Sequence, residues 1–272
     1  MPMREILKAE SKISYLVHNS NVRRWGNLIR NLDNWWDFFL WKLSGYRKPA
    51  TFVARLRNGI EVPLEARQRH EFKLMFMNHE YIWPIPNKKL NGVIIDLGAN
   101  VGFFTLWASL RYPHCKVLSF EPFPRNYEVL VQNIARNSLN NCHAIQCAVS
   151  GKTGEVVFGL ETTIENPTEP HIVEAKGADG RHFFTVPCLN LDDIMEKRSL
   201  QTVAFLKIDI EGSEYDVLYN LSDANYRKIQ RIGMETEDFD ERRNTRSLRA
   251  FLQEKGYKTV EVTPHLVHCW RI

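Results

Sequence analysis

The chain has 272 residues, of which 44% are hydrophobic and 25% are charged, and its formal net charge is +4. These values are ordinary for a globular protein with one large α/β domain, or with one domain and an extension. Because the charge is small and Lys and Arg are scattered, nothing indicates nucleic-acid binding.

The cysteines and the apolar runs bear on the compartment. The five cysteines are far apart and form no Cys-x-x-Cys pair, so we expect a reducing compartment without disulfides or a zinc site. No signal-peptide core and no run of 18 apolar residues is present. We therefore predict a cytoplasmic protein. The cysteines are Cys115, Cys142, Cys147, Cys188 and Cys269.

Residues 28–43 predict one amphipathic helix that ends near Gly45 and Pro49. Two interpretations of this helix stay open. It packs on the main domain or on a second subunit of a homodimer, or residues 28–48 lie peripherally on the inner face of a membrane. The apolar positions, three and four residues apart, are Leu28, Ile29, Leu32, Trp35, Trp36, Phe39, Leu40 and Leu43.

Residues 51–90 predict a short lead-in to the main domain. Asn58-Gly59 between alternating apolar residues predicts a hairpin of residues 51–56 with 60–64, and a short helix is expected over 66–78. We therefore divide the chain into a helical extension (1–50), the lead-in (51–90) and a main domain (91–272).

The main domain alternates strands and helices. This order predicts an α/β fold with a doubly wound, mostly parallel sheet that ends in an antiparallel hairpin. Strands are expected over 93–96, 116–121, 142–148, 203–208 and 229–234, with an added edge strand over 155–159 and a short strand over 183–187. Helices are expected over 103–110, 124–137, 191–197, 213–221 and 247–255, a polar insertion over 160–182, and the hairpin over 257–262 and 266–270. Tyr127, Leu130, Val131 and Ile134 are expected to face the sheet.

The stretch 93–104 predicts a buried strand, a glycine turn and a helix start. Its Asp-x-Gly-x-Asn-x-Gly order differs from the Gly-x-Gly-x-x-Gly of dinucleotide enzymes, and an acidic Asp96 would repel a pyrophosphate. A ligand with positive charge and no phosphate fits better, and S-adenosylmethionine (SAM) is such a ligand. The expected contacts are Asp96, Gly98, Ala99, Asn100, Gly102 and Phe103.

Two later stretches agree with a nucleoside ligand at this edge of the sheet. Glu121 ends the second strand, 25 positions after Asp96, where a carboxylate can accept hydrogen bonds from ribose hydroxyls. Pro122 and Ala148 are expected beside it. Lys207 lies inside an apolar strand and needs a partner, because an unpaired buried charge is costly. Asp209 and Glu211 follow it at alternate positions, and Asp209 is expected at the ligand as well.

Together these stretches resemble the FkbM family of SAM-dependent methyltransferases. The resemblance rests on residues 96–104, 120–122 and 206–214, with Asn133 and Asn137, and it covers roughly residues 90 to 240. It implies a class I methyltransferase fold, SAM as cofactor, and a small-molecule or glycan substrate. The implied reaction is O-methylation of a hydroxyl on a sugar, a glycolipid or polysaccharide, or a related natural product. The Lys-x-Asp-x-Glu-Gly-x-Glu element at 207–214 is its most specific part.

The expected reaction is an in-line attack of a substrate oxygen on the SAM methyl group. The candidate bases are Asp209, Glu211 and Glu235, and Lys207 would orient a carboxylate or stabilise the alkoxide. The carboxylates have no recognisable metal-ligand spacing, so no metal is expected. Two alternatives stay open: a SAM-binding or scaffold protein without catalysis, and a nicotinamide-dependent oxidoreductase, which the missing glycine disfavours.

Overall fold

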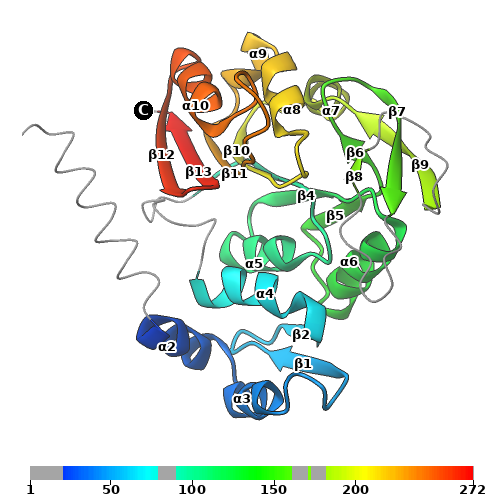
Figure 1. The fold of residues 1–272 in the computed structure, drawn as a ribbon, viewed down its shortest axis with the longest axis vertical. Helices are drawn as coiled ribbons and strands as arrows, with labels where there is room; N and C mark the ends of the chain where they lie inside the picture. The colour runs from blue at the N-terminus through cyan, green and yellow to red at the C-terminus, as the bar shows by residue number, and fades with distance from the viewer. Residues whose placement is uncertain (1–20, 79–89, 161–170, 173–181, 272) are drawn as a thin grey trace, which may run out of the picture.

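The computed structural model describes residues 21–78, 90–160, 171–172 and 182–271. Its centre is a seven-stranded sheet of order β12-β13-β11-β10-β3-β4-β5 (Figure 1). Five neighbouring strands, β11, β10, β3, β4 and β5, pair in parallel, and β13 pairs antiparallel with β11 and β12. The predicted doubly wound sheet and terminal hairpin are therefore confirmed. The strands are β3 (Val93–Leu97), β4 (Lys116–Phe120), β5 (Cys142–Ile145), β10 (Val203–Ile208), β11 (Arg231–Glu235), β12 (Tyr257–Thr263) and β13 (Leu266–Arg271).

The strand order reverses between β3 and β10. From β3 the chain continues outward to β4 and β5, then returns to place β10 and β11 on the other side of β3. Open α/β sheets bind ligands at the carboxyl ends of the strands beside such a reversal. The topology thus marks the place of the site before any side chain is considered.

Helices cover both faces of the sheet (Figure 1). β10 is buried at all its positions, as expected of a strand covered on both sides. One face carries α5 (Phe103–Arg111) and α6 (Pro124–Arg136); the other carries α7 (Leu191–Lys197), α8 (Glu214–Asn220), α9 (Asp223–Tyr226) and α10 (Thr245–Glu254).

The buried face of α6 differs in part from the predicted one. Val131 is 40% exposed, so its predicted contact with the sheet is wrong, whereas Asn133 is buried. The Asn133 side-chain amide donates to the carbonyl of Val101, 2.8 Å away. This bond satisfies a buried carbonyl of the turn before α5 and explains why a polar residue replaces an apolar one on this face.

The strand predicted over 142–148 is two strands in two sheets. β5 ends at Ile145 because its partner β4 ends at Phe120, and β6 (Ala148–Val149) then pairs with β9 (His182–Leu189). β7 (Gly154–Leu160), predicted as an added edge strand, lies between β9 and β8 (His171–Ile172) in this second, four-stranded sheet. The predicted insertion at 160–182 lies mostly outside the described residues.

The single helix predicted over 28–43 is wrong. The structure has α2 (Asn21–Asn31) and α3 (Trp35–Leu43), with a break between them. At the break the Asn34 side chain accepts from the Arg55 backbone N–H at 2.8 Å and donates to the Val53 carbonyl at 2.8 Å. The break occurs because residues 33 and 34 form hydrogen bonds with backbone groups on the free edge of β1. A continuous helix could not place them there.

The lead-in has the predicted hairpin, β1 (Thr51–Arg55) with β2 (Glu61–Glu65). The predicted helix is also present, as a 3₁₀ turn η1 (Ala66–Gln68), α4 (Arg69–Lys73) and a π turn η2 (Leu74–Asn78). Phe72 of α4 is fully buried, and its ring lies 5.8 Å from Phe38 of α3 and 5.9 Å from Phe103 of α5. One hydrophobic core therefore joins α3, the lead-in and the sheet, while the division at residues 50 and 90 stays a prediction.

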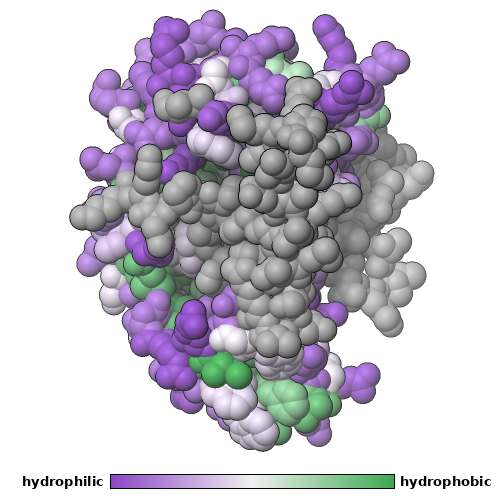
Figure 2. Space-filling view, turned by 90° about the vertical axis from the view of Figure 1, so that its left-hand side faces the viewer, coloured by the Kyte–Doolittle hydropathy of each residue, from purple (hydrophilic) through white to green (hydrophobic). Residues whose placement is uncertain are grey.

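The outer face of α3 is apolar and exposed. Trp36, Leu40 and Leu43 are 54%, 49% and 67% exposed. Figure 2 shows hydrophobic side chains at the lower end of the molecule, where α2 and α3 lie in Figure 1. No helix among the described residues has the length and apolar character to cross a bilayer. Contact of this face with a membrane or a second subunit stays a prediction, as does the cytoplasmic location.

Candidate active site

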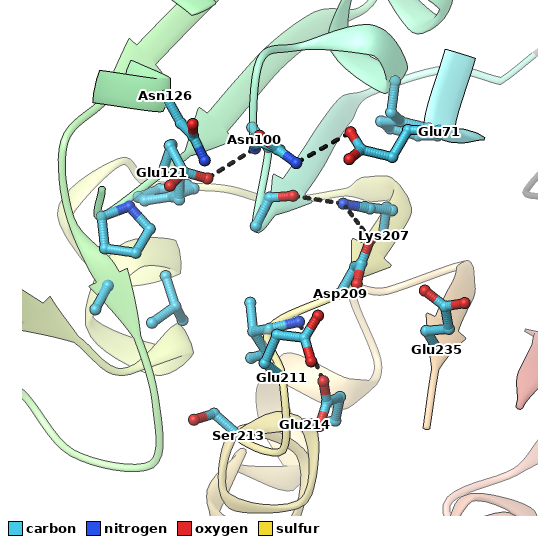
Figure 3. A pocket seen from close by; sticks show the side chains of 18 of the residues that line it. Glu71, Asn100, Glu121, Asn126, Lys207, Asp209, Glu211, Ser213, Glu214 and Glu235 are labelled. Carbon is cyan, nitrogen blue, oxygen red and sulfur yellow. Dashed lines mark hydrogen bonds and ion pairs between the residues drawn. The ribbon is translucent and has the colours of Figure 1, made fainter. Parts of the chain in front are cut away.

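A cavity of about 430 Å³ opens at the carboxyl ends of β3, β4, β10 and β11, the edge marked by the strand reversal (Figure 3). This volume is within the range of small-molecule sites. The lining comes from the turn after β3, the end of β4, the start of β6, the segment after β10, the end of β11, and α4 with η2 of the lead-in.

The turn after β3 forms one wall of the cavity. The backbone N–H groups of Gly98 and Ala99 donate to the Phe120 carbonyl at 3.0 and 2.9 Å, which ties the turn to β4. On the other side, a Cβ at Gly98 would lie 1.7 Å from the Asp209 carbonyl oxygen. Only glycine fits between these two neighbours, and the turn therefore presents backbone to the cavity. Gly98, Ala99, Asn100 and Phe103 all line it.

Gly102, predicted as a cofactor contact, does not line the cavity. It precedes α5 with φ +92°, and a Cβ there would lie 2.5 Å from a methyl carbon of Leu130. Its lack of a side chain serves the close packing of α5 against α6. Sequence spacing alone could not separate this packing role from a ligand contact.

Asp96 does not line the cavity either, and its side chain has no exposed surface. Its Oδ1 lies 3.2 Å from Nζ of Lys207, and its Oδ2 accepts from the Thr105 hydroxyl at 2.7 Å. The predicted direct contact of Asp96 with a ligand is thus replaced by a buried ion pair, and any influence of this carboxylate on a ligand passes through Lys207.

Lys207 joins the ends of β3 and β10. Its Nζ lies 3.4 Å from Oδ2 of Asp209 and donates to the Gly98 carbonyl at 2.7 Å (Figure 3). Burial by itself lowers the pKa of this ammonium, but the charges of Asp96 and Asp209 outweigh burial and hold the pKa above its ordinary value. Lys207 is therefore a permanent cation that fixes the glycine turn and one side of Asp209.

Glu121 faces the cavity from the end of β4 and is 5% exposed. Its two carboxylate oxygens accept from the backbone N–H groups of Asn100 and Phe123 at 2.7 and 2.9 Å. Burial raises the pKa of Glu121 to about 7, against the effect of these two hydrogen bonds. Each oxygen keeps a further lone pair for a ligand hydroxyl. Pro122 and Ala148, also predicted here, line the same cavity.

The candidate bases converge on the opposite side. Asp209, Glu211 and Glu235 all line the cavity, although they come from two strands (Figure 3). Glu211 lies in a turn with φ +49°, followed by Gly212 with φ +96°. The turn ends the strand pattern, so the alternation predicted from Lys207 through Asp209 does not continue to Glu211.

Several lining residues were not predicted as site residues. Glu214 lies inside the 207–214 motif, accepts from the Ile210 backbone N–H at 3.1 Å, and has its pKa raised to about 7 by burial. Its place in the motif could have identified it. Nothing in the sequence marks Asn126 of α6 or four lead-in residues as site residues, because residues of these types are common on ordinary amphipathic helices. The lead-in residues are His70, Glu71, Leu74 and Met75.

Among the residues the structure describes, no group of three or more His, Cys, Asp or Glu side chains is arranged to hold a metal ion. All five cysteines are buried and unpaired. The reducing compartment inferred from them stays a prediction.

Comparison with known proteins decides the family. The sequence model of the methyltransferase FkbM domain matches residues 96–259, more than half of the chain. The chain belongs to the FkbM methyltransferase family.

Three relatives of the chain are each less than 30% identical to it. The methyltransferase sdnD of Sordaria araneosa is 28% identical over 212 residues, which cover 68% of this chain and 80% of sdnD. The 31-O-demethyl-FK506 methyltransferase FkbM of Streptomyces tacrolimicus is 28% identical over 173 residues, 54% of this chain and 66% of that protein. The hexuronic acid methyltransferase AglP of Haloferax volcanii is 25% identical over 132 residues, 48% of this chain and 51% of AglP.

As an FkbM methyltransferase the chain takes its methyl group from SAM. The cavity suits this cofactor. The glycine turn offers backbone without a side chain, and Glu121 has one free lone pair on each oxygen for the ribose hydroxyls. Asp209, Glu211 and Glu235 add negative charge for a ligand that carries an ammonium and a sulfonium. Membership disfavours the nicotinamide-dependent alternative.

The raised pKa of Glu121 predicts that SAM binding weakens in acid. We predict that the ribose hydroxyls of SAM donate to the ionised Glu121 carboxylate, and in the free protein this carboxyl takes up a proton as the pH falls through about 7. The folded-state pKa of Glu121 lies above the ordinary 4.5, so between pH 4.5 and about 7 the folded protein binds a proton that the unfolded chain does not. The free energy of unfolding of the free protein is therefore higher at the acid end of this window. SAM affinity measured by calorimetry should fall about tenfold per pH unit below this pKa. Glu121→Gln should weaken binding at pH 8 and abolish the pH dependence; an equally steep profile in this variant would assign the titration to another group.

Proposed function

We propose that this FkbM methyltransferase transfers the methyl group to a hydroxyl oxygen of a sugar, a glycolipid or polysaccharide, or a related natural product. The observation that carries the proposal is the gathering of Asp209, Glu211 and Glu235 on the cavity that also holds Glu121 and the glycine turn. The names of two relatives support it, one an O-demethyl-FK506 methyltransferase and the other a hexuronic acid methyltransferase.

Bound SAM supplies an electrophilic methyl group on its sulfonium sulfur. The chain must place an acceptor oxygen in line with that group and exclude competing water, and such positioning can contribute on the order of 7–11 kcal/mol. A hydroxyl is a weak nucleophile, so removal of its proton during attack accelerates the reaction. In the proposed site, a carboxylate on the wall opposite Glu121 accepts this proton.

Asp209 is the first candidate for this base. Its side chain is 32% exposed, so one part can reach a ligand while Oδ2 stays 3.4 Å from Nζ of Lys207. In this proposal Lys207 orients Asp209 and does not itself stabilise an alkoxide. Its ammonium, which is 4% exposed, is already engaged by two carboxylates and two backbone carbonyls. Glu211 and Glu235 are the other candidates.

Asp209→Asn separates the roles of this residue. The change keeps the volume and removes the charge, so loss of the base should lower kcat about 100-fold or more at saturating SAM. If Asp209 instead contacts the SAM ammonium, SAM affinity falls and kcat at saturation is retained. Glu211→Gln and Glu235→Gln are compared in the same assay, and Glu128→Gln, an exposed acid on α6, is the control.

The acceptor class is tested with methyl-labelled SAM and a panel of glycans, glycolipids and polyketide-like alcohols. The expected result is label in an ether that resists mild base, as an O-methyl group does and a methyl ester does not. Label in an ester or an amine would contradict O-methylation of a hydroxyl. SAM binding without transfer to any acceptor would favour the non-catalytic alternative.

A further inference from the structure

We propose that Glu71 is a positioning residue of the SAM site. It belongs to α4 of the lead-in, outside the segment 96–259 that matches the FkbM domain. The inference is that the lead-in completes the cofactor site from outside the catalytic sheet, by holding the turn that carries Asn100.

The contact between the two parts is direct. Oε2 of Glu71 accepts from the side-chain amide of Asn100 at 3.0 Å, and the backbone N–H of Asn100 donates to Oε2 of Glu121 at 2.7 Å (Figure 3). Asn100 therefore lies between two carboxylates, one from the lead-in and one from the ribose-binding position. A shift of Asn100 would move the donor that orients Glu121.

The backbone of Asn100 needs such support. Its φ is +49°, in the left-handed region that non-glycine residues adopt at a cost, although Asn tolerates it better than most. A hydrogen bond to its side chain holds it in this conformation. Without that bond the turn gains alternative conformations, and SAM would have to select the competent one.

Aromatic packing holds α4 in place for this contact. Phe72, the residue next to Glu71, is fully buried between the rings of Phe38 and Phe103. Phe103 begins α5 directly after the glycine turn. The aromatic packing thus sets where Glu71 stands relative to the turn, and His70, Leu74 and Met75 extend the same wall of the cavity.

The test compares Glu71→Ala with Glu71→Gln. Calorimetry measures the affinity for SAM and S-adenosylhomocysteine, and thermal unfolding of the free protein measures stability. Glu71→Ala should weaken both ligands about tenfold, a fold-change in the range of one lost hydrogen bond to a charged group. Glu71→Gln keeps an oxygen acceptor for Asn100 and should stay within about threefold of wild type. Glu61→Gln is the matched control, since this lead-in glutamate contacts only Arg136, 3.9 Å away, among the charged residues described.

A double-mutant cycle tests the proposed route through Asn100. Asn100→Gly removes the side-chain donor, keeps the backbone N–H to Glu121, and adopts positive φ without strain. Once Asn100→Gly is present, Glu71→Ala should weaken SAM no further. If Glu71→Ala fails to fold, Asn100→Gly alone must weaken SAM while the free protein keeps its melting temperature. Three results would overturn the proposal and leave Glu71 a purely structural residue. The losses of Glu71→Ala and Asn100→Gly could add up in the double variant, or Glu71→Ala could bind SAM as tightly as Glu61→Gln does. The third is a drop in melting temperature that Glu71→Ala and Glu71→Gln share.

Discussion

Lys207→Met should lower the free energy of unfolding by about 3–5 kcal/mol, the cost of leaving one partner of a buried ion pair uncompensated. Asp96 has no exposed surface, and Nζ of Lys207 is 3.2 Å from its Oδ1. The Thr105 hydroxyl alone cannot replace a cation beside this carboxylate. Asp209 also loses its contact with Lys207, but it is 32% exposed and recovers solvation, so Asp96 accounts for most of the loss.

Urea unfolding at pH 7.5 measures this loss, with Lys116→Met as the control because Lys116 is exposed at the start of β4. Asp96→Asn introduced into Lys207→Met should recover part of the stability, since it removes the unpaired charge. A loss as small as that of Lys116→Met would show that water or a rearranged neighbour compensates Asp96. In that case the ion pair between Lys207 and Asp96 would not be a main source of stability.

Gly98→Ala should weaken SAM binding strongly and lower activity even more. The added Cβ would lie 1.7 Å from the Asp209 carbonyl oxygen, a backbone atom that cannot rotate away, and φ at this position is +72°. The turn and the segment after β10 must therefore move apart, by about 1 Å or more, and a misplacement of that size can cost about 100-fold. The same movement separates the Gly98 carbonyl from Lys207 and displaces Asp209, so activity should fall further than SAM affinity.

Gly59→Ala isolates the clash from the backbone strain. Gly59 has φ +87° in the lead-in hairpin, yet no atom lies within 4 Å of an added Cβ there. This control should cost only about 1 kcal/mol of stability and leave SAM affinity unchanged. If Gly98→Ala behaved like Gly59→Ala, the close approach of the turn after β3 to the segment after β10 would not be needed for the cofactor. Calorimetry with SAM and thermal unfolding measure both variants.

Predictions from local sequence patterns were wrong where a residue distant in the chain determined the local structure. The helical spacing of residues 28–43 is genuine, but the free edge of β1 requires the side chain of Asn34 and interrupts the helix. Val131 fits the apolar stripe of α6, yet Asn133 is the buried residue because the Val101 carbonyl needs a donor. The strand over 142–148 divides because β4 ends, a fact about its neighbour.

By itself the sequence determined the sheet, its parallel strands and the edge where the site lies. Buried strands are marked by local apolar runs, and the residues that follow them must meet at one edge once the strands pair in parallel. That is why Gly98, Glu121, Asp209 and Glu235 could be placed at one cavity.

Only the tertiary structure decided what each of the charged residues touches. In the sequence, Asp96 and Asp209 each appear as a carboxylate at a strand end. In the structure, Asp96 is fully buried beside Lys207, whereas Asp209 is partly exposed and lines the cavity. Glu71 appears as a polar position of an ordinary helix, and it meets Asn100 only because aromatic packing carries α4 to the glycine turn. Burial and charge pairing depend on neighbours distant in the chain, which no local pattern encodes.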